Sequence, residues 1–147
     1  MSTHLPEAVA TAERVLLRDL TRGAAVSAVT GAVSLAWGVG RSDDWCRGFG
    51  RQTLGWAAVN GVIAAAGARG MRTTDKPPAA RALKLRTTLA VNAVLDIGYV
   101  AAGVAGARSK HPRFAGAQGD GAAVVVQGLF LLWLDAKHAR AFHALVE

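Results

Sequence analysis

The chain has 147 residues, of which 52% are apolar and 18% are charged, with a net charge of +7 and a mean hydropathy of +0.26. The length suits one domain, and the apolar content exceeds that of an ordinary soluble protein. The basic residues lie between apolar segments without a nucleic-acid-binding motif, so we expect no nucleic-acid partner, and the single cysteine excludes an internal disulfide.

Residues 1–22 begin with polar positions, and apolar side chains then recur at helical spacing: Val9, Ala12, Leu16 and Leu20. This pattern predicts an N-terminal amphipathic helix at the membrane surface, with an ordinary solvated helix as the alternative. Residues 23–40 carry no charge and form the first predicted transmembrane helix. Small side chains line one of its faces and allow another helix to approach closely: Ser27, Gly31, Ser34 and Gly38.

The second predicted transmembrane helix, residues 53–68, is the shortest and has Asn60 near its centre. The basic segment 69–86 follows and contains two adjacent prolines, so it separates two predicted helical hairpins. In the loop before the second helix, Asp43 and Asp44 are adjacent carboxylates that we interpret as solvated rather than as a cation site.

Residues 87–107 form the third predicted span, because twenty-one helical residues extend roughly 30 Å, the thickness of a bilayer core. Asp96 lies at its centre, and Asn92 and Tyr99 share its helical face. A carboxylate at this depth costs on the order of 3 kcal/mol, so it requires polar partners or a proton. Such a residue indicates either a functional site or a hydrogen-bond network that fixes helix packing.

The fourth predicted helix, residues 121–134, contains Gln127. The sequence therefore predicts an all-α bundle of four transmembrane helices with one intramembrane polar site, made of Asn92, Asp96, Tyr99, Gln127, Asn60 and Ser34. Eleven of the seventeen Lys and Arg residues fall on one side of this topology. That bias places both termini and the 69–86 linker in the cytoplasm, and the chain in the inner (plasma) membrane.

The two hairpins also resemble each other. An alignment without gaps pairs Thr30, Ser34 and Trp37 with Asn92, Asp96 and Tyr99, and a second block pairs Gly50, Gln52 and Gly55 with Gly116, Gln118 and Gly121. A duplication would predict pseudo-twofold symmetry about the membrane normal, with Ser34 equivalent to Asp96. Chance similarity in a chain rich in Ala and Gly is the alternative.

Three stretches carry a resemblance to a known family: RGFGRQTLGW after the first helix, NAVLDIGY in the third and VVQGLFLLWLD in the fourth. Together they resemble an uncharacterised family of small four-helix bacterial integral membrane proteins, over most of residues 47–138. The resemblance implies a membrane location and four helices, and it implies no activity.

The chemistry-bearing residues do not define a cofactor or metal site. Asp135 and His138 have a spacing that suits one metal ion, but no further ligands match them. The three glutamates lie outside the predicted spans, which argues against a di-iron bundle, and the tail position of His138 and His143 argues against haem. No Ser, His and Asp arrangement is evident, so the pattern favours a protein without enzymatic activity but leaves the question open.

Three functions remain open. The first is a membrane protein that acts through helix packing, as a homo-oligomer or as an accessory subunit of a larger membrane complex. The second is a small transporter or channel in which Asp96 binds a proton or cation. The third is a lipid- or quinone-binding membrane protein or enzyme that uses Asp96 and its polar neighbours. A soluble helical bundle is the competing fold, and the absence of charged helix faces argues against it.

Overall fold

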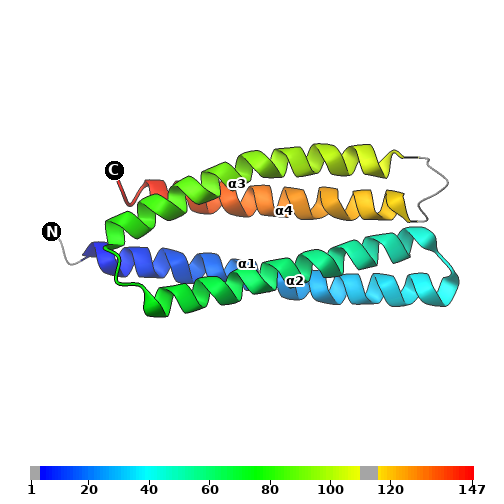
Figure 1. The fold of residues 1–147 in the computed structure, drawn as a ribbon, viewed down its shortest axis with the longest axis horizontal. Helices are drawn as coiled ribbons and strands as arrows, with labels where there is room; N and C mark the ends of the chain where they lie inside the picture. The colour runs from blue at the N-terminus through cyan, green and yellow to red at the C-terminus, as the bar shows by residue number, and fades with distance from the viewer. Residues whose placement is uncertain (1–3, 110–115) are drawn as a thin grey trace.

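The computed structural model describes residues 4–109 and 116–147, and these residues form four α-helices without a strand. The helices are α1 (His4–Arg41), α2 (Asp44–Thr73), α3 (Pro78–Ala107) and α4 (Ala117–His143). Consecutive helices run antiparallel, so α1 and α2 form one hairpin and α3 and α4 form the other (Figure 1). The start of α1, the end of α4 and the α2–α3 linker lie at the same end of the bundle (Figure 1). The predicted all-α fold with four helices is therefore confirmed.

The first helix is longer than the sequence pattern predicts, because residues 4–22 and 23–40 belong to one continuous helix of 38 residues. Its buried positions follow one uninterrupted stripe at helical spacing, and no proline breaks it: Val9, Glu13, Leu16, Leu20, Ala24, Ser27, Gly31 and Gly38. The segment predicted as a separate amphipathic helix is thus the first half of α1, and its apolar face packs on the bundle.

The junction between α1 and α2 explains the two adjacent carboxylates. Ser42 has a positive φ of 57°, and Asp43 then caps α2 by accepting a hydrogen bond from the Cys46 backbone N–H at 3.0 Å. This backbone hydrogen bond holds the pKa of Asp43 below its usual range. Asp44 forms an exposed ion pair with Arg47. Both acidic residues therefore serve the start of the helix.

Glycines bring the helices of each hairpin into backbone contact. In the first hairpin a Cβ on Gly31 would lie 3.0 Å from the Gly50 carbonyl oxygen, and in the second a Cβ on Gly103 would lie 2.9 Å from the Gly121 carbonyl oxygen. A third close approach joins the hairpins, because a Cβ on Gly119 in α4 would lie 2.8 Å from the Phe49 backbone nitrogen in α2. No side chain larger than hydrogen fits these positions without moving a helix.

These glycine contacts define which residues of the two hairpins occupy equivalent positions. They make Gly31 equivalent to Gly103 and Gly50 equivalent to Gly121. The sequence alignment instead pairs Gly50 with Gly116. It also pairs Gly31 with Ala93, which lies about ten residues before Gly103. The internal repeat therefore stays a prediction, and its alignment differs from the arrangement of the helix contacts.

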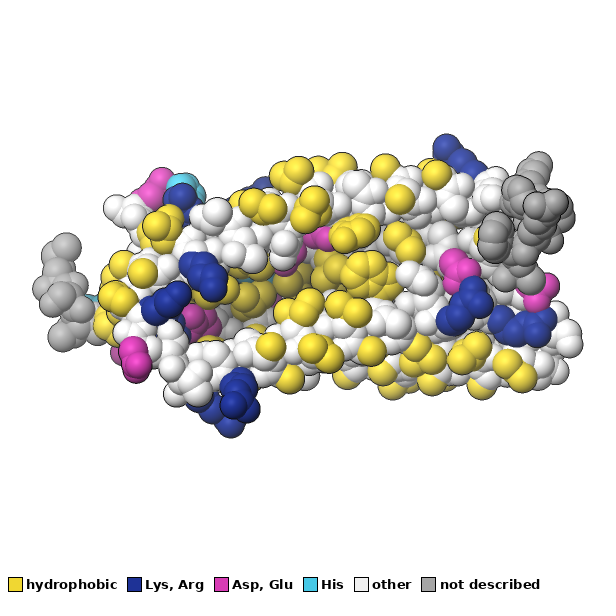
Figure 2. All heavy atoms as spheres, viewed as in Figure 1, with side chains coloured by type: hydrophobic (Ala, Val, Ile, Leu, Met, Phe, Trp, Pro, Cys, Tyr) yellow, Lys and Arg dark blue, Asp and Glu magenta, His cyan; other side chains and the backbone are white. Residues whose placement is uncertain are grey.

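The apolar core lies toward the end of the bundle that holds the α2–α3 linker, where Leu16, Leu89, Leu134 and Phe142 are buried. Elsewhere the helices turn large apolar side chains outward, and these side chains cover much of the surface (Figure 2). The most apolar windows of α1, α3 and α4 are only 22%, 17% and 33% buried, and each is long enough to cross a bilayer. Three helices thus suggest a membrane protein.

Candidate ligand-binding groove

A groove separates the two hairpins, because the backbones of α2 and α3 do not approach each other along the described residues. It encloses about 380 Å³. We call it the inter-hairpin groove and define it by six polar or aromatic lining residues and eight leucines: Trp56, Asn60, Asn92, Asp96, Tyr99 and Asp135, with Leu16, Leu17, Leu20, Leu85, Leu89, Leu95, Leu131 and Leu134. Figure 2 shows the hollow between the upper and lower helices, with apolar and acidic side chains inside it.

Two carboxyl groups meet at the wall of this groove. Asp96 on α3 is 3% exposed and Asp135 on α4 is 6% exposed, and both side chains line the groove close to each other. Asn92, one turn before Asp96 on α3, lines the same part of the groove. Because a carboxylate only accepts, a hydrogen bond between two carboxyl groups requires a proton on one of them. The two neighbouring carboxyl groups are therefore able to share one proton, which would leave one negative charge on the pair.

Three polar groups of the groove have no hydrogen-bond partner among the described residues. They are the indole Nε1 of Trp56, the amide Nδ2 of Asn60 and the carboxyl Oδ2 of Asp96. Asn60 is almost fully buried, at 1% exposure. Leaving such a group unpaired costs about 1–3 kcal/mol, and natural structures rarely keep several together. Two N–H donors and a carboxyl oxygen on side chains that line the groove thus have unused hydrogen-bonding capacity.

Aromatic side chains bridge the groove on one side. The rings of Trp56 on α2 and Tyr99 on α3 meet edge to face, with their centroids 5.6 Å apart. They are the link between two helices whose backbones stay apart. The indole N–H of Trp56 is thereby held beside Asn60, which lies one turn further along α2.

The structure brings four of the six predicted site residues together. Asn60, Asn92, Asp96 and Tyr99 all line the inter-hairpin groove. The other two lie elsewhere: Gln127 faces α1, where its Nε2 donates to Ser27 Oγ at 2.8 Å, and Ser34 donates to the Cys46 carbonyl oxygen at 3.1 Å, near the α1–α2 junction. The expected equivalence of Ser34 with Asp96 does not place them in one site.

Asp135 and Trp56 line the groove, but the sequence did not indicate that they belong to this site. Asp135 was expected to end the fourth span, but α4 continues to His143 and carries Asp135 beside Asp96. Trp56 gave no signal, because an aromatic residue in an apolar helix is common. The i, i+3 spacing of Asp135 and His138 was the available hint, and the described residues show no cluster of three metal-binding side chains around it.

A charged cluster lies near the carboxyl pair, one turn further along α4. His138, one turn after Asp135, is buried, and its Nε2 lies 3.2 Å from Asp19 Oδ2 on α1. Lys137 Nζ lies 2.8 Å from the same oxygen. The hydrogen bond from Lys137 holds the pKa of Asp19 below its usual range. The Asp96–Asp135 pair therefore lies near a second group of charged or titratable side chains, which consists of Asp19, Lys137 and His138.

Four helices, three of which are apolar enough to cross a bilayer, suggest a membrane protein, and they hold two buried carboxyl groups beside a mainly apolar groove. The chain belongs to the DUF6992 family, described as a family of unknown function, whose model matches residues 19–136. The match covers every residue that lines the groove except Leu16 and Leu17, and it confirms membership of an uncharacterised family. No curated protein and no solved structure matches the chain.

The shared proton makes the Asp96→Asn variant informative. We expect this variant to be at least as stable as the wild type, because the amide donates to Asp135 and one of two adjacent acids is removed. The measurement is the midpoint of SDS-induced loss of helical circular dichroism in mixed micelles. Asn92→Asp, which adds a third acid to the groove, is the opposite control and should lower the midpoint. A marked loss of stability in Asp96→Asn would contradict the shared-proton arrangement.

Proposed function

We propose that the chain is an inner-membrane protein in which all four helices cross the bilayer and both termini are cytoplasmic. Three helices satisfy the length and hydropathy that a span requires. α2 packs antiparallel along α1, so it crosses the bilayer wherever α1 does. The excess of Lys and Arg in the linker and near both termini supports the cytoplasmic assignment.

Within this membrane protein, the inter-hairpin groove binds a lipid-soluble molecule with an oxygen-bearing head group, of the quinone or quinol class. The observation that carries this proposal is the group of three unpartnered polar atoms on Trp56, Asn60 and Asp96, whose side chains line a groove that is otherwise mainly apolar. A carbonyl oxygen satisfies the two N–H donors, and a hydroxyl satisfies the carboxyl oxygen. The single negative charge of the carboxyl pair favours a neutral head group over an anionic one.

The size and surroundings of the groove support a lipophilic ligand. Its volume of about 380 Å³ falls within the usual range for small-molecule sites. Several apolar residues that line the groove on α2 and α3 are also exposed on the surface of the bundle: Val59, Ile63 and Leu95. A molecule dissolved in the bilayer therefore reaches the groove between α2 and α3 without crossing water. The leucines of α1 and α4 then contact its apolar tail.

Tryptophan fluorescence tests this proposal. Titration of the purified protein with a short-tailed benzoquinone, such as decylubiquinone, is expected to quench emission saturably, because the indole of Trp56 contacts the head group. Trp56→Phe should lose the saturable component. Asn60→Leu should weaken binding about fivefold to tenfold, the effect of one lost hydrogen bond.

Trp133→Phe is the matched control, because Trp133 lies outside the inter-hairpin groove. This variant should keep the saturable quenching at a lower total emission. If quenching rises linearly with quinone and is the same in Trp56→Phe and Trp133→Phe, the quinone merely dissolves in the micelle and the proposal is wrong.

The other two hypotheses stay predictions. Homo-oligomerisation, or assembly into a larger membrane complex, is checked by the mass of the detergent-solubilised particle. Asp96-dependent proton or cation transport is checked by flux into vesicles with Asp96→Asn as the comparison, since the amide cannot bind a proton as the carboxylate does.

A further inference from the structure

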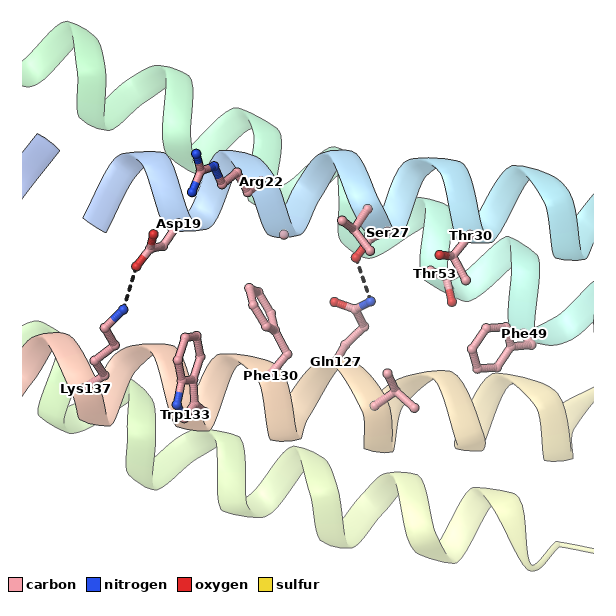
Figure 3. Close-up of a pocket in the computed structure, with 13 residues that line it drawn as sticks. Asp19, Arg22, Ser27, Thr30, Phe49, Thr53, Gln127, Phe130, Trp133 and Lys137 are labelled. Carbon is pink, nitrogen blue, oxygen red and sulfur yellow. Dashed lines mark hydrogen bonds and ion pairs between the residues drawn. The ribbon is translucent and has the colours of Figure 1, made fainter. Parts of the chain in front are cut away.

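A second cavity lies on the opposite side of the bundle, between α1 and α4. It encloses about 440 Å³ and shares no lining residue with the inter-hairpin groove. Figure 3 shows its two polar levels: Asp19, Arg22 and Lys137 at one end, and Ser27 with Gln127 further along the helices. Phe130 and Trp133 lie between α1 and α4 at the charged end (Figure 3). We call it the α1/α4 cavity.

The charged end of the α1/α4 cavity is basic. Lys137 Nζ is paired with Asp19, which stays ionised because that hydrogen bond lowers its pKa. Arg22 is exposed and forms no ion pair with any residue of the described ranges 4–109 and 116–147. One positive charge is therefore left without a counter-charge at the mouth of the cavity. It lies where the charge-free part of α1 begins, at the cytoplasmic side of the proposed topology.

The inner polar level has free hydrogen-bonding capacity. Gln127 is buried and uses only its Nε2, which donates to Ser27 Oγ at 2.8 Å, so the other amide atom has no partner. The hydroxyl of Thr53, 2% exposed, also has none. Because a hydroxyl both donates and accepts, Ser27 and Gln127 can exchange roles, and Gln127 can then offer an N–H to the cavity. Two buried polar side chains that line the cavity thus have hydrogen-bonding capacity that the described residues leave unused.

The spacing of the two levels matches a glycerophospholipid. Ser27 follows Arg22 by five residues, which is about 7.5 Å along the helix axis. In such a lipid the ester groups lie one glycerol unit inward from the phosphate. The walls between and beyond the two levels are apolar, with Val26, Phe130 and Val126. The cavity therefore presents a cation, then ester-binding groups, then an apolar surface. A glycerophospholipid carries its phosphate, ester groups and acyl chains in the same order.

We infer that the α1/α4 cavity binds one anionic glycerophospholipid of the cytoplasmic leaflet, with its phosphate at Arg22 and Lys137, its ester groups at Gln127 and Ser27, and an acyl chain along Val26, Val126 and Phe49. Basic pockets between membrane helices on the cytoplasmic side bind anionic head groups in the same way. This inference rests on the membrane location proposed above, but not on quinone binding.

Native mass spectrometry of the purified chain in detergent tests the inference, with phosphatidylglycerol and phosphatidylcholine added in parallel. We expect one phosphatidylglycerol per chain at concentrations where phosphatidylcholine does not bind. Arg22→Gln should weaken phosphatidylglycerol binding about fivefold, the effect of one interfacial cation. Arg14→Gln removes the same charge from an exposed position on α1 outside the cavity and should change binding less than about twofold.

Thr30→Trp provides a second, independent variant, because Thr30 is exposed at the cavity wall and a large ring there occupies the acyl-chain path without altering any charge. It should also weaken phosphatidylglycerol binding. Equal affinity for both lipids, equal losses in Arg22→Gln and Arg14→Gln, or complete displacement of the lipid by glycerol 3-phosphate would each overturn the inference. Trp56→Phe should leave lipid binding intact, so failure here is distinguishable from failure of the quinone proposal.

Discussion

Replacing Arg81 by Met is expected to lower the free energy of unfolding by roughly 3 kcal/mol, because it leaves a buried carboxylate without its partner. Arg81, near the start of α3, donates from Nε to Glu13 Oε1 on α1 at 3.1 Å and from Nη2 to the second carboxylate oxygen. Glu13 is 6% exposed and belongs to the stripe of α1 that packs on the bundle. The measurement is the SDS-unfolding midpoint and slope followed by circular dichroism.

Two further variants separate the cost of an unpaired charge from lost packing. The double variant Glu13→Gln with Arg81→Met should recover part of the stability, because no buried charge then remains. Arg47→Met breaks the exposed pair with Asp44 and should cost less than about 1 kcal/mol. If Arg81→Met and Arg47→Met have equal effects, the Glu13–Arg81 pair contributes no more than a surface ion pair.

The helices were predictable because their apolar residues form long segments without charges. The continuity of α1 was not, because Arg14, Arg18 and Arg22 mark an apparent boundary in the sequence. These arginines lie on the outer face of α1, whereas Leu16 and Leu20 continue the buried stripe. A charge count along the chain does not reveal on which side of the helix each charge lies, so it places the start of the helix too late.

The groove was predictable only where its residues share one helix. Asn92, Asp96 and Tyr99 have helical spacing, so the sequence placed them on one face. Asp135 and Trp56 join them through the register between helices, which the glycine contacts fix. Those contacts differ in register from the alignment of the two hairpins, so Ser34 does not share a site with Asp96. Gln127, which the sequence assigns to the same polar site, faces α1 instead.

The glycine contacts lead to the second large effect: Gly121→Ala is expected to destabilise the chain by about 2–3 kcal/mol, toward the upper end of overpacking costs. A Cβ on Gly121 meets the backbone nitrogen of Ala107 and lies 2.7 Å from the carbonyl oxygen of Gly103. Both are backbone atoms of α3, so no side-chain rotation relieves the clash and the two helices must separate. Their separation also draws Asp96 away from Asp135, so saturable quinone quenching should weaken in the same variant.

Gly98→Ala is the matched control, because it makes the same substitution in the same hairpin at a position where nothing lies within 4 Å of the added Cβ. Alanine is the better helix former, so this variant should gain up to about 1 kcal/mol and keep quinone quenching unchanged. Opposite signs for the two variants would show that the α3/α4 contact, rather than helix propensity, decides the outcome. If Gly121→Ala were stabilising as well, the close backbone approach at Gly103 and Ala107 would not exist in the membrane, and the register that joins Asp135 to Asp96 would lose its physical basis.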